Sequence, residues 1–303
     1  MLRSLLPESL YLPISRLPKQ SLNEIRLRIG KPIVVNMLGE NMYLTTEGLS
    51  SKKDNALICK TSYVEYILAQ ASNNSLYTIN DQLIRGYISV KGGIRIGVAG
   101  DVVTSEGNIR TIKNIASLNI RIPHDVKNCS LNAYLYLVKN GEVQNTLVVS
   151  PPGAGKTTFL RDFAVQIGKR EKNLNLLIVD ERCEISGCGM EGGLDVGDST
   201  DIYTNCTKKY AFENGIRSMK PDVILTDEIN LDSDLEAIEN AVTSGVKVVA
   251  SIHAEDIQDL KNKKAFSHLL NSGLFTRFVV LSCDSGPGTL RGIYNEHLNC
   301  IYC

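Results

Sequence analysis

The sequence contains no apolar run long enough to cross a bilayer and no excess of charge of either sign. No stretch of about 18 consecutive apolar residues occurs, so we expect no segment that spans a membrane. Lysine plus arginine and aspartate plus glutamate balance at 33 each, and no basic stripe stands out. The charge pattern therefore gives no electrostatic case for nucleic acid as a direct ligand.

The sequence also lacks a secretion signal and a metal-site pattern of cysteines. The first apolar residues are interrupted at Pro7, too early for a signal peptide, so we expect a cytoplasmic protein that reaches a membrane only through partners. A chain of 303 residues does not need disulfides as staples. The pairs Cys183/Cys188 and Cys300/Cys303 have no companion pair at zinc-site spacing. We therefore expect reduced thiols throughout.

The composition is that of a soluble globular protein, with 43% hydrophobic and 22% charged residues. The length suffices for one large domain or two ordinary ones, and neither internal repeats nor low-complexity segments occur. Changes in patterning predict an N-terminal α+β domain at 1–123, a polar linker with a short helix at 124–145, and an α/β domain at 146–303.

In the N-terminal part, alternation of polar and apolar residues predicts strands, and a Gly-Gly turn predicts a hairpin. Arg95 and Arg121 stand within strands that otherwise read as half-buried. They are either outward-facing solubility residues or groups that reach a nucleotide phosphate. The expected elements are a strand at 24–29, a hairpin at 33–44, a helix at 62–71, a hairpin at 86–100 and a strand at 118–122.

The second part alternates apolar strands with amphipathic helices, which predicts a parallel sheet covered by helices. The polar, glycine-rich segment at 186–207 is long for a structureless loop, so we expect it to be functional or mobile. The expected strands are 146–149, 176–179, 223–226, 246–252 and 277–281, and the expected helices are 157–167, 209–219 and 235–243.

The strongest motif is a P-loop, in which an apolar strand leads through a small-residue loop into a helix N-terminus. Lys156 would reach the β- and γ-phosphates of ATP, and the Thr157 hydroxyl would hold Mg²⁺. Ser150 stands where the consensus has its first glycine. The alternative is a glycine-rich connection that binds nothing. The residues expected to bind the nucleotide are Pro152, Gly153, Ala154, Gly155, Lys156, Thr157 and Thr158.

Acidic residues and a histidine follow three of the other predicted strands. Asp227 and Glu228 form a Walker B pattern, in which Asp227 would bind Mg²⁺ and Glu228 would orient or deprotonate the attacking water. Asp180 and Glu181 would supply a second acidic group, and His253 would sense the γ-phosphate. The alternative for both acidic pairs is a helix cap or a salt bridge, and for His253 a structural role.

Together with the P-loop, several stretches resemble the stage III sporulation protein AA family, which is similar to the hexameric ATPases of type II and type IV secretion and pilus systems. The resemblance implies a RecA-like P-loop ATPase core behind the N-terminal domain, with the nucleotide at or near a subunit boundary. It also implies that Asp180 and Glu181 match an acidic box, that His253 matches a histidine box, and that Arg95 and Arg121 approach the phosphates. The stretches are 24–32, 92–97, 117–122, 179–182, 216–224 and 226–229.

The resulting hypothesis is an Mg²⁺-dependent ATP hydrolase with catalytic Lys156 and Glu228. The resemblance implies a homo-oligomeric motor, a hexamer, in the mother cell of an endospore-former. Its partners would be membrane-embedded proteins of a channel to the forespore. The alternatives are a nucleic-acid-associated P-loop ATPase and a nucleotide-binding scaffold that does not hydrolyse.

Overall fold

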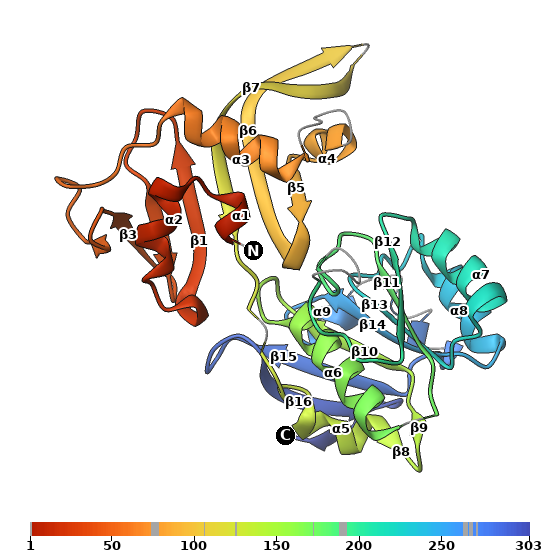
Figure 1. The fold of residues 1–303 in the computed structure, drawn as a ribbon. Coiled ribbons are helices and arrows are strands. Elements are labelled where there is room, and N and C mark those ends of the chain that lie inside the picture. The colour runs from red at the N-terminus through yellow and green to blue at the C-terminus, as the bar shows by residue number, and fades with distance from the viewer. Residues whose placement is uncertain are drawn as a thin grey trace. The chain divides into compact units, whose positions relative to one another are not determined.

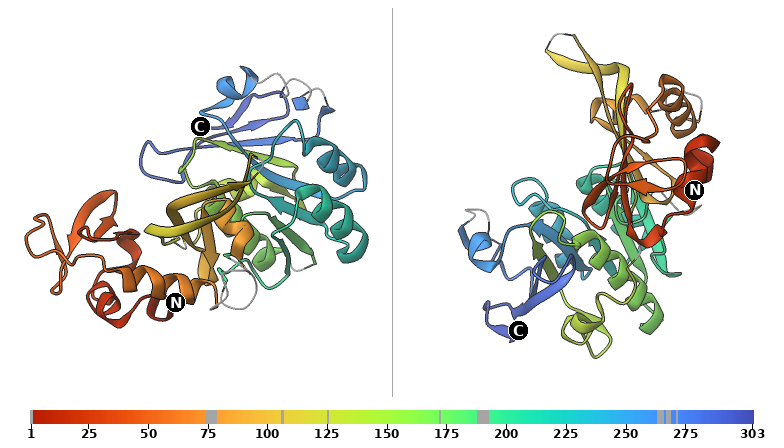
Figure 2. Two further views of the ribbon diagram at one scale, coloured as in Figure 1. Left: turned by 90° about the horizontal axis from the view of Figure 1, so that it is seen from above. Right: turned by 90° about the vertical axis from the view of Figure 1, so that its left-hand side faces the viewer.

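The computed structural model divides the chain into two compact units, Met1–His124 and Asp125–Cys303 (Figures 1 and 2). The predicted linker at 124–145 contains helix α5 (Leu131–Leu137), whose Ala133 and Leu137 are buried in a core cluster of the second unit. The residues described are 2–73, 79–105, 107–124, 126–171, 173–187, 193–262, 266, 269–270 and 272–303.

The first unit is built on one antiparallel sheet of seven strands, in the order β4-β3-β2-β1-β7-β6-β5. Both predicted hairpins, β2–β3 and β5–β6, are confirmed by their pairing. The strands are β1 (Leu22–Arg28), β2 (Val34–Met37), β3 (Glu40–Leu44), β4 (Leu49–Ser50), β5 (Tyr87–Val90), β6 (Ile94–Ser105) and β7 (Asn108–Arg121).

The core of this unit lies between one face of the sheet and its helices. Ile25 and Leu27 of β1 are fully buried with Leu118 and Ile120 of β7, and Leu10 and Ile67 from two helices pack in the same cluster. Since side chains alternate along a strand, the residues between them in β1 and β7 belong to the opposite face. The helices are α1 (Leu2–Leu5), α2 (Glu8–Ser15), α3 (Thr61–Ala71) and α4 (Asn80–Ile84).

The second unit is an α/β layer structure on a mixed sheet of eight strands, in the order β12-β11-β13-β14-β10-β15-β16-β17. The pairs from β12 to β15 are parallel, as predicted, and β16 and β17 are added antiparallel. The strands are β10 (Thr146–Ser150), β11 (Leu176–Asp180), β12 (Thr200–Thr204), β13 (Val223–Thr226), β14 (Lys247–His253), β15 (Arg277–Ser282), β16 (Thr289–Asn295) and β17 (Cys300–Tyr302).

Helices cover both faces of this sheet. Phe163 of α6 packs with α5 in one core cluster, and Phe212 of α7 packs with α8 and α9 in the other (Figure 1). Because both faces are covered, the central strands read as continuous apolar runs. The helices are α5, α6 (Lys156–Arg170), α7 (Lys208–Met219), α8 (Leu235–Thr243) and α9 (Ile257–Asn262), and β8 (Val138–Lys139) pairs with β9 (Glu142–Val143).

Two features differ from the expectations. The segment at 186–207 contains strand β12, which pairs in parallel with β11; residues 188–192 lie outside the described chain. The expectation of reduced thiols throughout is wrong for Cys300 and Cys303, because the structure places their Cα atoms 6.6 Å apart and joins them in a disulfide. The described free thiols are Cys59, Cys129, Cys183, Cys206 and Cys283.

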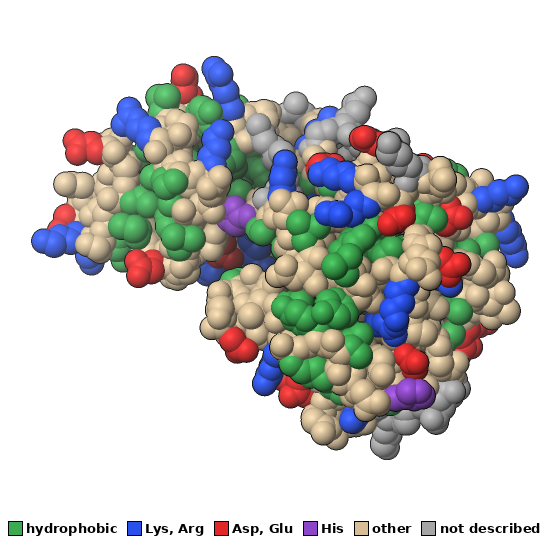
Figure 3. All heavy atoms as spheres, turned by 90° about the horizontal axis from the view of Figure 1, so that it is seen from below, with side chains coloured by type: hydrophobic (Ala, Val, Ile, Leu, Met, Phe, Trp, Pro, Cys, Tyr) green, Lys and Arg blue, Asp and Glu red, His purple; other side chains and the backbone are tan. Residues whose placement is uncertain are grey.

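On the face seen in Figure 3, basic and acidic side chains lie interspersed among hydrophobic ones. Within the described part of the chain, no helix has both the length and the apolar character needed to cross a membrane.

Candidate functional site

The P-loop connects β10 to α6 and closes tightly against a second loop. Gly155 precedes the helix with φ +86°, in the left-handed region that favours glycine. A Cβ at Gly155 would lie 3.1 Å from the backbone nitrogen of Gly288, whose N–H donates to the Ala154 carbonyl at 3.0 Å. Both the backbone conformation and the tight contact with the loop at 288 therefore favour glycine at 155.

Ser150 does not carry the backbone strain that its place in the motif suggests. It ends strand β10, is fully buried, and is not among the described residues with positive φ, so glycine's conformational freedom is not used there. Its hydroxyl donates to the Pro151 carbonyl at 3.0 Å and accepts from Lys156 Nζ at 3.2 Å. Serine thus adds a contact to the lysine that glycine could not make.

Lys156 is buried, and the chain itself supplies its hydrogen-bond partners. Its Nζ donates to the carbonyls of Ser150 and Pro151, each at 3.0 Å, and to Nδ1 of His253 at 2.7 Å. Burial lowers the pKa of the Lys156 ammonium, and the nearby carboxylates, first Asp227 and then Glu228, partly offset that shift. A phosphate would take the place of these internal acceptors.

A short hydrogen bond joins the P-loop to the end of β13. The Thr157 hydroxyl donates to Oδ2 of Asp227 at 2.6 Å, and Ser251 of β14 donates to Oδ1 of Asp227 at 2.6 Å. Strands β13 and β14 are parallel neighbours, so their carboxyl ends meet at one edge of the sheet. A hydroxyl and a carboxylate side by side are the hard oxygen ligands that Mg²⁺ prefers, so these residues fit that ion.

Glu228 has an unusual backbone conformation, and both oxygens of its carboxylate contact neighbouring side chains. Its φ is +39°, and its N–H donates to Asp227 Oδ1 at 2.9 Å and to the Ser251 hydroxyl at 3.0 Å. Oε2 accepts from Arg182 at 2.5 Å, and Oε1 lies 3.0 Å from Nε2 of His253. Positive φ at a non-glycine residue is strain of the kind found at functional sites.

His253 links the lysine to the glutamate. An ammonium group has only donors, so His253 Nδ1 accepts from Lys156 and the ring proton lies on Nε2, where it donates to Glu228. His253 ends β14 directly beside Ser150, its register partner in β10. The imidazole therefore bridges the Lys156 ammonium and the Glu228 carboxylate.

The acidic pair that ends β11 is used differently from the Walker B pair. Asp180 is buried, and its carboxylate accepts from the backbone of Glu184 and from the backbone and hydroxyl of Ser186 at 2.7–2.8 Å. Glu181 pairs with the buried ammonium of Lys208 at 3.0 Å. In this conformation Asp180 orders the loop after β11, and Glu181 forms a salt bridge; no helix begins in the described residues of that loop.

A cavity of about 20 Å³ lies between the ends of β11 and β13. It holds roughly one water molecule. Carboxylates dominate its walls, with two cations among them. The lining residues are Asp180, Glu181, Arg182, Glu184, Lys208, Asp227 and Glu228.

Arg95 and Arg121 belong to the first unit, where the structure brings them together. They are register partners on β6 and β7 and therefore share one face of the sheet. The Arg95 guanidinium lies 3.6 Å from the centre of the Tyr87 ring, and Arg121 Nε lies 3.3 Å from the Glu24 carboxylate. The arginines thus form part of an ordered polar face of the first unit.

Sequence reasoning did not single out Ser251 and Arg182, although both contact the Walker B pair. A hydroxyl inside the apolar run of β14, two residues before His253, is a signal that could have found Ser251. Arg182 follows the acidic pair directly, but its contact with Glu228 joins positions 46 residues apart. That contact depends on the neighbouring placement of β11 and β13 and has no local sequence pattern.

Comparison with known proteins places this chain in a family. The family model described as "Sporulation stage III, protein AA" matches residues 9–301. The Stage III sporulation protein AA of Bacillus subtilis (strain 168) is 35% identical over 302 residues, which cover 97% of this chain and 94% of the relative. The uncharacterized protein ycf45 of Cyanidium caldarium is 26% identical over 129 residues, 42% of this chain and 38% of that protein.

Solved structures share the fold at low sequence identity. The ATPase DotB of Legionella pneumophila has a TM-score of 0.56 at 14% identity, covering 86% of this chain and 72% of DotB. The pilus retraction motor PilT with bound ADP has a TM-score of 0.54 at 14% identity, covering 88% of this chain and 76% of PilT. The predicted RecA-like P-loop core with a smaller N-terminal α+β domain is confirmed.

Proposed function

The chain belongs to the sporulation stage III protein AA family, and from this premise we propose that it is an Mg²⁺-dependent ATP hydrolase. The observation that carries the proposal is the 2.6 Å hydrogen bond between Thr157 and Asp227, which brings the P-loop hydroxyl to the acidic strand end. A glycine-rich connection without a ligand would not need a buried lysine, a hydroxyl and two carboxylates at one sheet edge.

In the proposed reaction the triphosphate lies on the loop at 152–158, and Lys156 exchanges its internal acceptors for phosphate oxygens. Mg²⁺ held by Thr157 and Asp227 would neutralise charge on the β- and γ-phosphates. Glu228 orients the attacking water and accepts its proton. The one-water cavity beside Glu228 supports this role.

His253 is proposed as the γ-phosphate sensor. When Lys156 turns to a phosphate, Nδ1 of His253 loses its donor, and the hold of His253 on Glu228 changes with it. Arg182 would then remain as the second anchor of the Glu228 carboxylate. Asp180 and Glu181 act through the loop that carries Arg182, and Arg95 and Arg121 of the first unit are proposed to neutralise phosphate charge.

We also propose that the protein works as a homo-oligomeric ring, a hexamer, in the cytoplasm. It would power a membrane-embedded channel between mother cell and forespore, since a relative over nearly the whole chain is the Stage III sporulation protein AA of Bacillus subtilis, and its structural neighbours include the ATPase DotB and the pilus retraction motor PilT. The mass of the chain with and without a slowly hydrolysed ATP analogue tests the assembly, and a monomer in both conditions would contradict it.

Phosphate release at saturating ATP over a range of Mg²⁺ concentrations tests the hydrolase. Asp227→Asn should lower turnover by about 10²-fold or more and raise the Mg²⁺ concentration required, because one charged ligand is lost. Asp232→Asn is the matched control, since Asp232 is exposed in the turn that follows and should leave turnover unchanged. No phosphate release by the parent chain, or equal turnover in both variants, would contradict the proposal.

A further inference from the structure

The face of the first sheet that points away from its helices carries a pocket with two arginines. Leu27 of β1 and Leu118 of β7 are register partners in the core, so their sequence neighbours point to the other face. Two rows of side chains cross three strands there. The rows are Arg26–Asn119–Gly97 and Arg28–Ser117–Ala99, from β1, β7 and β6.

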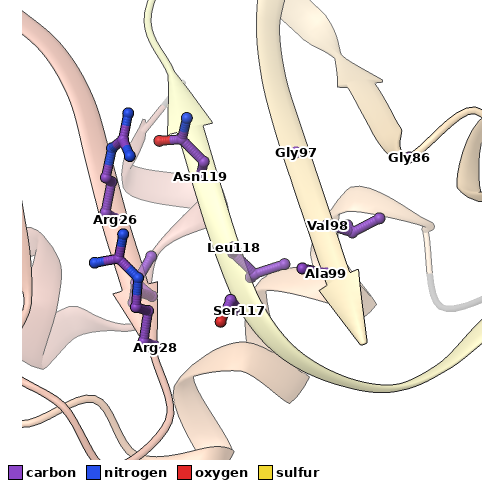
Figure 4. A pocket seen from close by; sticks show the side chains of 10 residues that line it. Arg26, Arg28, Gly86, Gly97, Val98, Ala99, Ser117, Leu118 and Asn119 are labelled. Atoms are coloured by element: carbon purple, nitrogen blue, oxygen red, sulfur yellow. The ribbon is translucent and has the colours of Figure 1, made fainter. Parts of the chain in front are cut away.

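The pocket has a volume of about 220 Å³, and Figure 4 shows its parts. Arg26 and Arg28 extend from β1 on one side, and Asn119 and Ser117 stand beside them on β7. Gly97 contributes no side chain on β6, which leaves the hollow open. The lining residues are Arg26, Leu27, Arg28, Gly86, Gly97, Val98, Ala99, Ser117, Leu118 and Asn119.

The charge of the pocket is positive and partly fixed in place. Glu24 accepts from Nε and NH2 of Arg26 at 3.0 and 2.7 Å, and the same carboxylate also pairs with Arg121. Glu24 thereby orients Arg26 without neutralising the site. Arg28 is exposed and has no ion pair or hydrogen bond to the side chains that the structure describes, and no acidic residue lines the pocket.

Asn119 presents an unmet hydrogen-bond acceptor at the same place. Its Oδ1 is buried and has no donor within the described part of the chain. A buried carbonyl oxygen without a donor is costly, so native structures usually supply one. Figure 4 shows this oxygen directed toward the strand that carries Arg26.

We propose that this pocket binds a small phosphomonoester that also carries a hydroxyl or amino donor. A tetrahedral phosphate has enough terminal oxygens to reach two guanidinium groups, whereas one arginine fork satisfies a carboxylate. The pocket exceeds the size of a single phosphate, so the ligand carries a further part, and a donor on that part meets Asn119. The class includes nucleoside monophosphates and sugar phosphates.

The pocket shares no residue with the P-loop, and it belongs to the first unit whereas the P-loop belongs to the second. Its lining lies wholly within 26–119, whereas the P-loop lies within 150–158. Arg95 and Arg121 share the sheet face but do not line the pocket. Binding here is therefore expected to survive the loss of ATP binding and of hydrolysis.

Calorimetric titration of the full chain carrying Lys156→Ala tests the proposal with AMP and ribose 5-phosphate as probes. Both should bind, and Arg28→Gln added to that chain should weaken binding about tenfold, because a charge-assisted hydrogen bond is lost. Arg110→Gln, an exposed arginine on β7 outside the pocket, is the control and should change affinity less than twofold.

Asn119→Ala provides a second test, which distinguishes a specific site from non-specific binding of anions to exposed arginines. It should weaken ribose 5-phosphate binding and leave the binding of sulfate unchanged, because sulfate has no donor at neutral pH. Equal affinities for AMP and ribose 5-phosphate would show that the pocket recognises the phosphosugar. A preference for AMP would show that it also recognises the base. Both outcomes support the site. Absence of binding at millimolar probe, or equal losses in Arg28→Gln and Arg110→Gln, would overturn it. Because calorimetry measures binding without hydrolysis, the result does not depend on whether the proposed ATPase activity is found.

Discussion

The P-loop site of the second unit and the arginine pocket of the first unit differ in how far the chain satisfies their charges. Lys156 is buried, with two carbonyl oxygens, a hydroxyl and an imidazole nitrogen within hydrogen-bond distance of its three N–H donors, whereas Arg28 is exposed without a described partner. Asp227 and Glu228 have donors on their carboxylate oxygens, whereas Asn119 Oδ1 has none in the described chain.

The two sites would therefore respond differently to a ligand. A nucleotide at the P-loop would have to replace existing hydrogen bonds, and in the proposed mechanism this exchange would make the neighbouring Glu228 sensitive to occupancy. A ligand in the arginine pocket fills unmet groups and breaks fewer contacts. The first arrangement suits a catalytic switch, and the second suits simple binding.

The largest effect is expected from Lys156→Ala. Loss of the ammonium that meets the phosphates should lower turnover by roughly 10²- to 10³-fold, since transition-state charge is then unpaired. Lys169→Ala, an exposed lysine on the same helix, is the control and should keep parental turnover. Phosphate release measures both. Parental activity in Lys156→Ala would contradict the assignment.

The pH dependence of ATP binding distinguishes a lysine ammonium from an arginine guanidinium at position 156. Burial lowers the pKa of Lys156 below the ordinary value of 10.5, so the charged form is lost at a lower pH than in an exposed lysine. ATP affinity should therefore fall as pH rises toward 10.5, by about tenfold per pH unit above the lowered value. Lys156→Arg should remove this dependence, because a guanidinium keeps its proton. Calorimetry across this pH range measures the ATP affinity, and an affinity of the parent chain that does not change with pH would contradict the prediction.

Substitutions at the two loop glycines, Gly153 and Gly155, distinguish backbone strain from steric crowding as causes of lost stability. Gly153 and Gly155 both have positive φ, but a Cβ at Gly153 meets nothing within 4 Å, whereas one at Gly155 meets Gly288. Gly153→Ala should lower the free energy of unfolding by about 1 kcal/mol, and Gly155→Ala should lower it further. Denaturant titration compares them. Equal losses would show that the loop at 288 yields to the new methyl group.

Ser150→Gly is expected to have the smallest effect. The residue does not use positive φ, so glycine gains nothing in the folded loop and loses the hydroxyl contact to Lys156. Nucleotide affinity should fall by about two- to threefold, the value of one weak hydrogen bond. A rise in affinity or turnover would show that serine restricts the cradle.

The sequence predicted those parts of the site that depend on local pattern. Asp227 and Glu228 directly follow β13, Lys156 and Thr157 follow β10 after the short loop at 151–155, and parallel strands bring these ends together. Strand β12 escaped prediction because it is a half-exposed edge strand whose residues alternate weakly. The contact of Arg182 with Glu228 and the pocket at Arg28 depend on which strands are neighbours and on their register, which no local window contains.

The most direct test of the central claim is a paired measurement on Glu228→Gln. Calorimetry should find ATP affinity within about threefold of the parent chain, because Lys156 and the P-loop are intact. Phosphate release should fall by roughly 10²-fold or more, because the base is lost. Glu213→Gln, exposed on α7, is the control. Normal turnover by Glu228→Gln would contradict the account.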